Sequence, residues 1–139
     1  MFLLDTNVLS ALMLPHLPSP LAEWRAGTPA RLLCTATVCQ AEILAGIAVL
    51  PAGRRRSDLA EAARFIFEDN FAERIWPFDT AAAQAYAEIF ATRRRIGRST
   101  KPTDLMIAAI ALSRDAGVVT RNVGNFDGCG VAVINPWQE

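Results

Sequence analysis

Short apolar runs alternate with longer amphipathic segments along this chain, a pattern typical of strands separated by helices. Five runs predict strands, at residues 2–4, 31–34, 74–78, 117–120 and 131–134. The segments between them predict helices, at residues 8–14, 19–27, 37–50, from about 57 to 71, 79–96 and 102–117. Helical segments that separate short apolar strands predict an α/β layer fold with a mainly parallel sheet.

Residues with special backbone preferences mark the boundaries of these elements. Ser19 and Pro20 predict the N-cap and the first position of the second helix, and Asp79 predicts the N-cap of a later one. Pro77 interrupts the third strand, which places that strand at a sheet edge. The three arginines at 54–56 predict an exposed basic turn.

The composition indicates one globular domain with balanced charge. The chain has 139 residues, of which 52% are apolar and 20% charged, and this excludes a disordered chain. No repeat or linker divides it, so we expect residues 1–139 to form a single domain. Because 14 basic residues balance 14 acidic ones, any attraction for nucleic acid must come from a local basic patch.

Several features bear on the compartment and on the chemistry that is excluded. An odd number of cysteines, 3, without CxxC spacing favours a reducing compartment over a disulfide framework or a zinc site. The first residues do not resemble a signal peptide, and no apolar run is long enough to cross a bilayer. We therefore expect a cytoplasmic protein without a membrane partner. The single histidine, His16, lies in a proline-rich loop, which argues against a Ser-His-Asp triad.

Three acidic residues lie where a parallel sheet would gather them, near the carboxyl ends of its strands. Asp5 follows the first strand, Glu42 lies on the helix after the second, and Asp104 opens the helix before the fourth. Each also has a structural interpretation, as a helix N-cap, a partner of an arginine, and a complement to the helix dipole, respectively. The helix at 37–50 is apolar nearly all round, which predicts that it is buried together with Glu42.

Carboxylates gathered at one place repel one another, and a bound divalent cation relieves this repulsion. An all-oxygen set of ligands favours Mg²⁺ or Mn²⁺ over zinc. With no histidine in reach as a base, activation of water by the metal is the chemistry that such a set supports, as in phosphodiester hydrolysis. The sequence thus predicts that Asp5, Glu42 and Asp104 are metal ligands and catalytic residues.

Several motifs in combination resemble the PIN-domain ribonucleases. The motifs are Leu3-Leu4-Asp5-Thr6-Asn7-Val8-Leu9-Ser10, Ala41-Glu42, Pro102-Thr103-Asp104-Leu105-Met106-Ile107-Ala108, Val119-Thr120-Arg121-Asn122 and Asn135-Pro136-Trp137. They cover nearly the whole chain, and they resemble most closely the VapC-type toxins of toxin–antitoxin modules, in the FitB-like branch. The resemblance implies a PIN domain, with a five-stranded sheet sandwiched by helices, and an acidic site at the three carboxylates named above.

The resemblance also implies an endoribonuclease toxin that needs Mg²⁺ or Mn²⁺ and is neutralised by a VapB- or FitA-type antitoxin. It implies a homodimer and allows a larger toxin–antitoxin assembly on operator DNA. Asn122 stands where many relatives carry a fourth acid, so it joins the catalytic candidates without adding charge. Thr6, Asn7 and Thr120 would hydrogen-bond the acids from behind.

A basic segment leads directly into Asp104 and is a candidate RNA-binding surface. It consists of Arg93, Arg94, Arg95, Arg98 and Lys101. Its alternative interpretation is a solvated helix end, where cations favour the dipole. Trp137 is expected to anchor the C-terminal segment by packing rather than to stack on bases.

Asn122 leaves a second function open. In that alternative the chain is a catalytically weak PIN-fold binding module that acts with its antitoxin on operator DNA. Retention of the three other acids favours the ribonuclease. A phosphatase or phosphoacceptor domain on a similar fold is disfavoured, because the chain has no added nucleophile and no glycine-rich phosphate loop.

Overall fold

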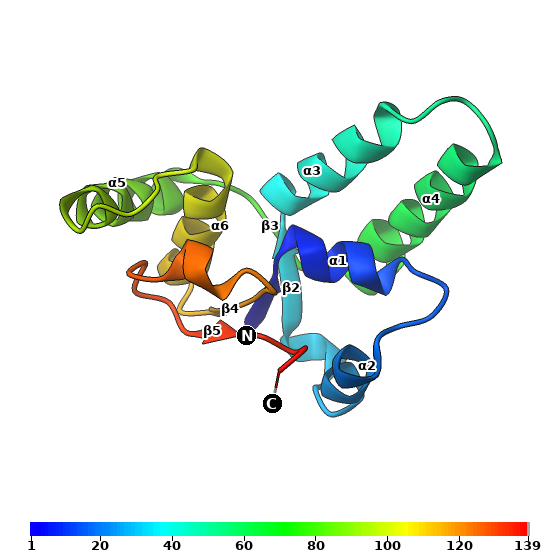
Figure 1. The fold of residues 1–139 in the computed structure, drawn as a ribbon, viewed down its shortest axis with the longest axis horizontal. Coiled ribbons are helices and arrows are strands. Elements are labelled where there is room, and N and C mark those ends of the chain that lie inside the picture. The colour runs from blue at the N-terminus through cyan, green and yellow to red at the C-terminus, as the bar shows by residue number, and fades with distance from the viewer. Residues whose placement is uncertain (139) are drawn as a thin grey trace.

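The computed structural model describes residues 1–138, and these contain a five-stranded sheet with helices on both sides (Figure 1). The strands are β1 (Phe2–Leu4), β2 (Leu33–Ala36), β3 (Ile75–Trp76), β4 (Gly117–Val119) and β5 (Val133–Ile134). They lie in the order β3-β2-β1-β4-β5, and every neighbouring pair is parallel. The predicted parallel sheet and the edge position of the third strand are confirmed.

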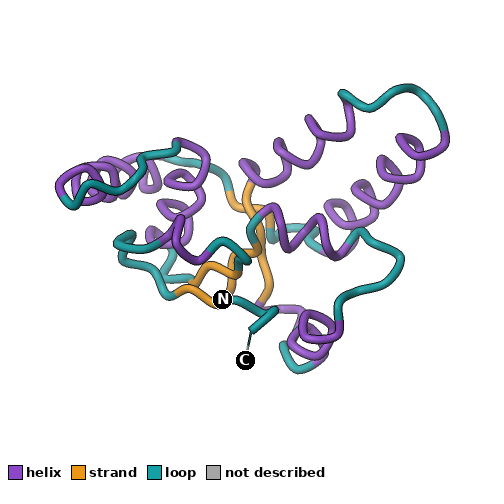
Figure 2. The backbone as a smooth tube through the Cα atoms, viewed as in Figure 1, coloured by secondary structure: helices purple, strands orange, loops and turns teal. Residues whose placement is uncertain are grey.

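The described residues form six α-helices, which cover the sheet in two groups. The helices are α1 (Thr6–Leu12), α2 (Ser19–Ala26), α3 (Thr37–Ala48), α4 (Arg54–Phe65), α5 (Thr80–Arg95) and α6 (Pro102–Ser113). Single turns of other helix types lie at Ala30–Leu32, Ile66–Asn70 and Val123–Phe126. In Figure 1, α5 and α6 lie on the left of the strands and α1 to α4 on the right, and Figure 2 shows the strands gathered between them.

The core fixes the ends of the two central strands and the start of α6. The strand residues Leu3, Leu4, Val118 and Val119 have no exposed surface. In α6, the residues from 105 to 111 are buried except for the half-buried Met106. Full burial of an aliphatic side chain stabilises the fold by about 1.5–3 kcal/mol, so these elements are strongly held in place. The backbone at the ends of these elements is therefore fixed, and so are the attachment points of the side chains there.

The expectation that the helix at 37–50 is buried all round is wrong. Leu44 and Val49 have relative exposures of 47% and 82%, and Glu42 is half-buried. Helix α3 packs against α1, α4 and α6, while its apolar side chains Leu44 and Val49 face solvent. An apolar pattern is the same for a face in the core and for an apolar face left on the surface. The sequence pattern therefore predicted more burial of this helix than the structure shows.

Three boundary predictions are also wrong. The arginines at 54–56 form the first turn of α4 rather than a loop, because Gly53 already breaks the chain before them. Ser19 is the first residue of α2, Pro18 occupies the N-cap position, and no side chain caps this helix. The helix expected to reach residue 71 ends at Phe65 and continues as a π turn at Ile66–Asn70.

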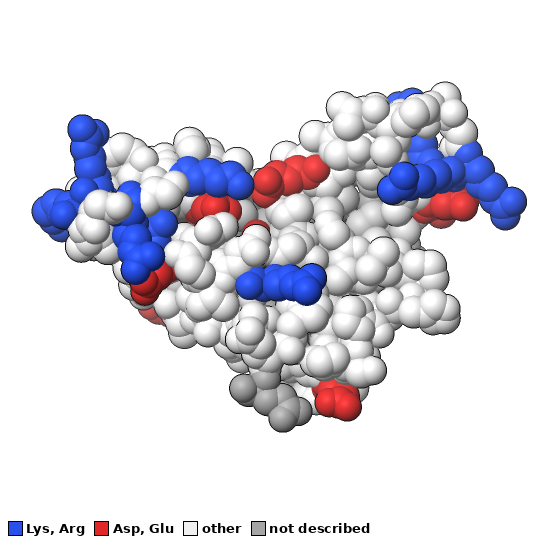
Figure 3. Space-filling model, in the orientation of Figure 1, with Lys and Arg blue, Asp and Glu red and all other residues white. Residues whose placement is uncertain are grey.

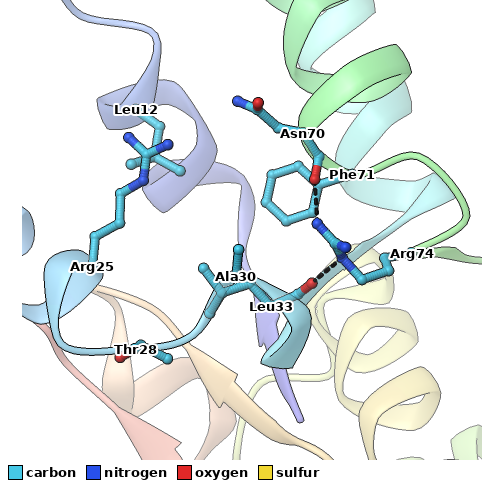
Figure 4. Close-up of a pocket in the computed structure, with 8 residues that line it drawn as sticks. All are labelled: Leu12, Arg25, Thr28, Ala30, Leu33, Asn70, Phe71 and Arg74. Carbon is cyan, nitrogen blue, oxygen red and sulfur yellow. Dashed lines mark hydrogen bonds between the residues drawn. The ribbon is translucent and has the colours of Figure 1, made fainter.

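At the end of the sheet opposite the strand carboxyl ends, a pocket of about 130 Å³ lies beside the start of β2 (Figure 4). Arg74 lines this pocket. Its Nε donates to the Leu33 carbonyl at 2.9 Å, and its Nη2 donates to the Asn70 carbonyl. These bonds tie β2 to the π turn, so the arginine has a structural role. Within residues 1–138, no helix has the length and apolar character needed to span a membrane.

Candidate active site

The order of the strands reverses between β1 and β4. The chain runs from β1 outward through β2 to β3, and then returns to place β4 on the other side of β1. The register pairs Leu4 with Val119, so the next residues, Asp5 and Thr120, lie side by side beyond the strand ends. The Asp5 amide also donates to the Val119 carbonyl at 2.9 Å. In parallel sheets, such a reversal leaves the crevice where ligands bind.

The two oxygens of the buried Asp5 carboxylate have different partners. Its residue exposure is 4%, and Oδ1 accepts a hydrogen bond from the Thr6 amide at 2.8 Å, which caps α1. Oδ2 accepts from the Thr120 hydroxyl at 2.8 Å and from the Asn7 amide group at 3.2 Å. The capping interpretation is therefore correct, and the second oxygen is held in a fixed orientation at the strand edge.

Thr120 and Asn7 form the hub of this network. Thr120 has no exposed surface, and its Oγ1 accepts from Asn7 Nδ2 at 3.1 Å and from the Asn122 amide at 3.0 Å while donating to Asp5. On the other side, the Thr6 hydroxyl donates to Glu42 Oε1 at 2.7 Å. Thr6, Asn7 and Thr120 therefore contact the acids from α1 and β4 and restrict their rotation.

Burial and mutual repulsion couple the acidic groups. Burial is the main factor that raises the pKa of Asp5, and the Asp104 and Glu42 carboxylates add to it against the hydrogen bonds from Thr120 and Thr6. Burial likewise raises the pKa of Asp104, where Glu42 adds to the effect and Lys101 opposes it. Figure 3 shows acidic atoms in the hollow between the two lobes of the molecule, with basic side chains on the neighbouring surface.

The chemistry of the donor set fits a hard divalent cation. All three acids offer oxygen ligands. Burial is the main cause of the raised pKa of Asp5 and of Asp104, and repulsion by the other carboxylates adds a smaller part, which a cation would relieve. In the described part of the chain, no three acidic, histidine or cysteine side chains stand close enough together to hold an ion as they are oriented. Glu42 is turned towards the hydroxyl of Thr6 in this arrangement.

The basic segment before Asp104 divides into exposed and buried residues. Arg94, Arg95, Arg98 and Lys101 are exposed. Arg93 has a relative exposure of 3%, and its guanidinium donates to the Ser99 carbonyl at 3.0 and 2.9 Å and to the Asp127 carbonyl. Arg93 thus fastens the loop after α5 from inside and is not part of the exposed basic surface, a correction to the sequence-based assignment.

Asn122 lies outside the buried network. It is an exposed residue three positions after the end of β4, and only its backbone amide bonds to Thr120. Asn125, which the sequence did not single out, lines a small cavity of about 50 Å³ together with Asp104 and Lys101. No sequence signal points to Asn125, because the turn that brings it to α6 follows from tertiary packing.

Cys39 is a second residue near the site that no sequence motif singles out. It is fully buried in α3, and burial together with the Asp5 carboxylate raises the pKa of its thiol to about 12. A neutral thiol therefore lies beneath the acids, where it adds no charge to the site.

Thr120→Val tests the hub directly. The valine is nearly isosteric but leaves Asp5, Asn7 and the Asn122 amide without their shared partner, and unsatisfied buried groups cost about 1–3 kcal/mol. We expect the free energy of unfolding in urea, measured in EDTA, to fall by about 2 kcal/mol. Thr120→Ser keeps the hydroxyl and should lose clearly less. Equal losses in the two variants would show that the methyl group, not the hydroxyl, is what matters.

The chain is thus an α/β protein with a parallel sheet and with an acidic site where the strand order reverses. The model of the PIN domain family matches residues 2–127, and this chain belongs to that family. The resemblance found in the sequence motifs is therefore confirmed.

Relatives match over the full length of the chain. The plasmid stability protein StbB of Pseudomonas syringae pv. tomato is 38% identical, with 99% of each chain covered. The VapC ribonuclease Y4jK of Sinorhizobium fredii is 31% identical over 99% of each chain, and the toxin FitB of Neisseria gonorrhoeae is 33% identical over 100% of each.

Solved structures agree with these relatives. The crystal structure of FitAcB from Neisseria gonorrhoeae contains a chain that matches with a TM-score of 0.92 and 33% identity, covering 100% of both chains. A structure of FitAB bound to a DNA fragment gives a TM-score of 0.93 at 33% identity and covers 100% of this chain and 97% of that one.

Proposed function

We propose that this chain is the metal-dependent endoribonuclease toxin of a type II toxin–antitoxin module, acting in the cytoplasm as a single PIN domain. The observation that carries the proposal is the coupled set of carboxylates, Asp5, Glu42 and Asp104, at the switch point of a PIN-family sheet. Full-length relatives named as a VapC ribonuclease and as the toxin FitB support it.

In this proposal Asp5, Glu42 and Asp104 hold Mg²⁺ or Mn²⁺, and Asn122 adds at most a neutral ligand. The bound ion would supply activation of water and stabilisation of negative charge on the phosphate. Hydrogen bonds from Thr120, Asn7 and Thr6 orient the carboxylates before the ion arrives.

The phosphates of RNA are repelled by the carboxylates of this site, so nearby cations are required for RNA to bind. The exposed residues Arg94, Arg95, Arg98 and Lys101 supply them on the side of α5 and α6. We propose that they hold the phosphates next to Asp104, whose carboxylate Lys101 already influences.

An apolar groove offers a place for the antitoxin. It has a volume of about 330 Å³ and lies between α1, α3 and α4, and it reaches from Thr6 and Glu42 to Leu50 and Leu59. We propose that a segment of a VapB- or FitA-type antitoxin occupies it, as a neutralising partner would need apolar contacts beside the acids. A second copy of the chain would cover the exposed outer side of α3, with Leu44 and Val49, and the assembly would bind operator DNA.

The deciding experiment measures cleavage of single-stranded RNA by the purified, antitoxin-free chain with Mn²⁺, Mg²⁺ or EDTA. We expect cleavage with either ion and none in EDTA. The alternative, a binding module with weak catalysis, predicts no cleavage with either ion while the complex with the protein encoded next to this gene still binds operator DNA.

The acids should also make the stability of the metal-free protein depend on pH. Because the pKa values of Asp5 and Asp104 are raised above 3.8 in the folded state, their contribution to stability is fully present below that pH. It is lost as the pH rises through the folded-state values, and Mg²⁺ should restore it. Urea unfolding in EDTA at several pH values tests this.

Asp104→Asn removes one of the two groups and is the variant to compare with the wild type. Its stability relative to the wild type should rise with pH in EDTA, and this gain should shrink with Mg²⁺. The exposed Asp69→Asn serves as the matched control. A difference between wild type and Asp104→Asn that does not change with pH would contradict the coupling.

A further inference from the structure

Arg121 is an exposed cation that directly continues β4 past the buried site. Its backbone amide donates to Asn7 Oδ1 at 3.1 Å, and the same Asn7 side chain donates to Asp5 Oδ2 at 3.2 Å. A single asparagine therefore links the backbone of Arg121 to the most buried carboxylate. Thr120 lies beside Asp5 across the sheet, so Arg121 is only one residue further along the chain from the carboxylate site.

The side chain of Arg121 is held in one direction by an indole. Its guanidinium carbon lies 5.2 Å from the centre of the Trp137 ring. Trp137 is half-buried, its backbone amide donates to Asn135 Oδ1 at 3.0 Å, and the preceding Pro136 is buried. An arginine stacked on an aromatic face keeps the N–H donors along its edge available for a planar anion such as phosphate.

No acidic partner satisfies this cation within residues 1–138. None of the five ion pairs found there includes Arg121, and no hydrogen bond from its guanidinium is found there either. By contrast, the buried Arg93 uses its guanidinium entirely on the Ser99 and Asp127 carbonyls. Arg121 is thus a fixed, exposed cation whose donors point to no group of the described protein.

Arg121 also lies away from the basic segment already assigned to RNA. Arg98 and Lys101 belong to the loop between α5 and α6, which leads into Asp104, whereas Arg121 follows β4 and rests on the C-terminal segment. Cations from two separate segments therefore adjoin the carboxylates: Lys101, from the loop before α6, acts on Asp104, and Arg121, after β4, is linked to Asp5 through Asn7. A strand of RNA that crosses the acids needs phosphate contacts on both sides.

We propose that Arg121, held on Trp137, binds a phosphate of the RNA on the β4 side of the carboxylates and so positions the strand across them. The inference rests on the proposed ribonuclease function. It makes Arg121 a positioning residue, which acts on the placement of RNA and not on the reacting atoms.

The test combines RNA binding and RNA cleavage for Arg121→Gln, Arg121→Lys and Trp137→Leu. Binding of a fluorescent single-stranded RNA by the metal-free protein is measured in EDTA at several salt concentrations. Loss of one phosphate contact lowers the slope of log K against log salt by about 0.7 for a single strand. We expect this change for Arg121→Gln, together with a KM for cleavage in Mn²⁺ raised by about fivefold and a nearly unchanged kcat.

The other variants separate charge from stacking. Arg121→Lys should keep the salt slope but not the full affinity, because the ammonium group lacks the planar edge. Trp137→Leu should weaken binding at an unchanged slope, because it frees the guanidinium without removing its charge. The exposed Arg31→Gln, in the turn before β2 at the other end of the sheet, is the matched control and should change neither quantity.

Two outcomes would overturn the inference. Arg121→Gln with wild-type affinity and salt slope excludes a phosphate contact, and a loss of thermal stability alone would reduce Arg121 to an anchor for the C-terminal segment. Failure of the proposed function is recognised separately. A wild-type protein that binds RNA through Arg121 but cleaves none with either ion would contradict the ribonuclease and leave the contact standing.

Discussion

Asp104→Asn is expected to lower the rate of RNA cleavage at saturating Mn²⁺ by at least about 100-fold, more than the loss of a group behind a metal ligand costs. The same loss is expected for Asp5→Asn and for Glu42→Gln. Each substitution removes a negative charge from a site where three carboxylates are coupled and would share one cation. The measurement is single-turnover cleavage of a defined RNA across a Mn²⁺ titration.

The three variants should differ in stability, which separates a lost ligand from a lost fold. Asp5 Oδ2 accepts from Thr120 and Asn7 and Oδ1 accepts from the Thr6 amide, so in either orientation the NH2 group of an asparagine would face a donor. Asp104 is half-buried and has no such bonds among residues 1–138, so Asp104→Asn should melt at or above the wild-type temperature in EDTA. Asp104→Asn is therefore the cleanest of the three.

A contradictory result is easy to recognise. If Asp104→Asn keeps its fold and cleaves RNA at close to the wild-type rate, Asp104 is not a ligand and the proposed site is wrong. The exposed Asp69→Asn, with the same change of charge on the surface, should cleave like the wild type.

Gly46→Leu is expected to weaken antitoxin binding by between about tenfold and 100-fold, because overpacking costs about 1–3 kcal/mol. Gly46 lies in the middle of α3 and lines the apolar groove, and a Cβ built there meets nothing within 4 Å. The free protein has room for the added side chain, whereas a partner segment in the groove would collide with it. Titration calorimetry with the protein encoded beside this gene measures the effect.

The same substitution should stabilise the free protein. Glycine within a helix costs about 1 kcal/mol relative to good helix formers, so Gly46→Leu should raise the melting temperature while it lowers the affinity. Ala60→Leu, on the exposed side of α4 and outside the groove lining, is the control and should bind normally. Unchanged affinity of Gly46→Leu would show that the partner does not use this groove.

The sequence by itself determined the layer architecture and the order of the strands and helices along the chain. Strong local signals carried that result, such as Asp79, whose carboxylate does cap α5 by accepting from the Ala82 amide at 3.0 Å. The buried helix α6 was equally visible, because a continuous apolar run has only one stable place in a small α/β protein. The spacing of Asp5, Glu42 and Asp104 was sufficient to nominate the site, since parallel strands end at one edge.

Tertiary structure alone decided which of the nominated residues face solvent and which are enclosed. Arg93 and Arg94 are adjacent in the same basic run, yet the first is buried against the loop after α5 and the second is exposed. Helix α3 has an apolar surface nearly all round, yet one side of it is left uncovered. Local sequence cannot distinguish these cases, because burial depends on which distant segment packs there.

The contacts that orient the site also belong to the tertiary structure. Thr120 meets Asp5 across 115 positions of sequence, and Arg121 meets Trp137 through the path of the C-terminal segment. A sequence pattern fixes which residues follow a strand, because that depends on the chain itself. The distances and the shared hydrogen bonds arise only when β1, β4 and the C-terminal segment come together in one fold.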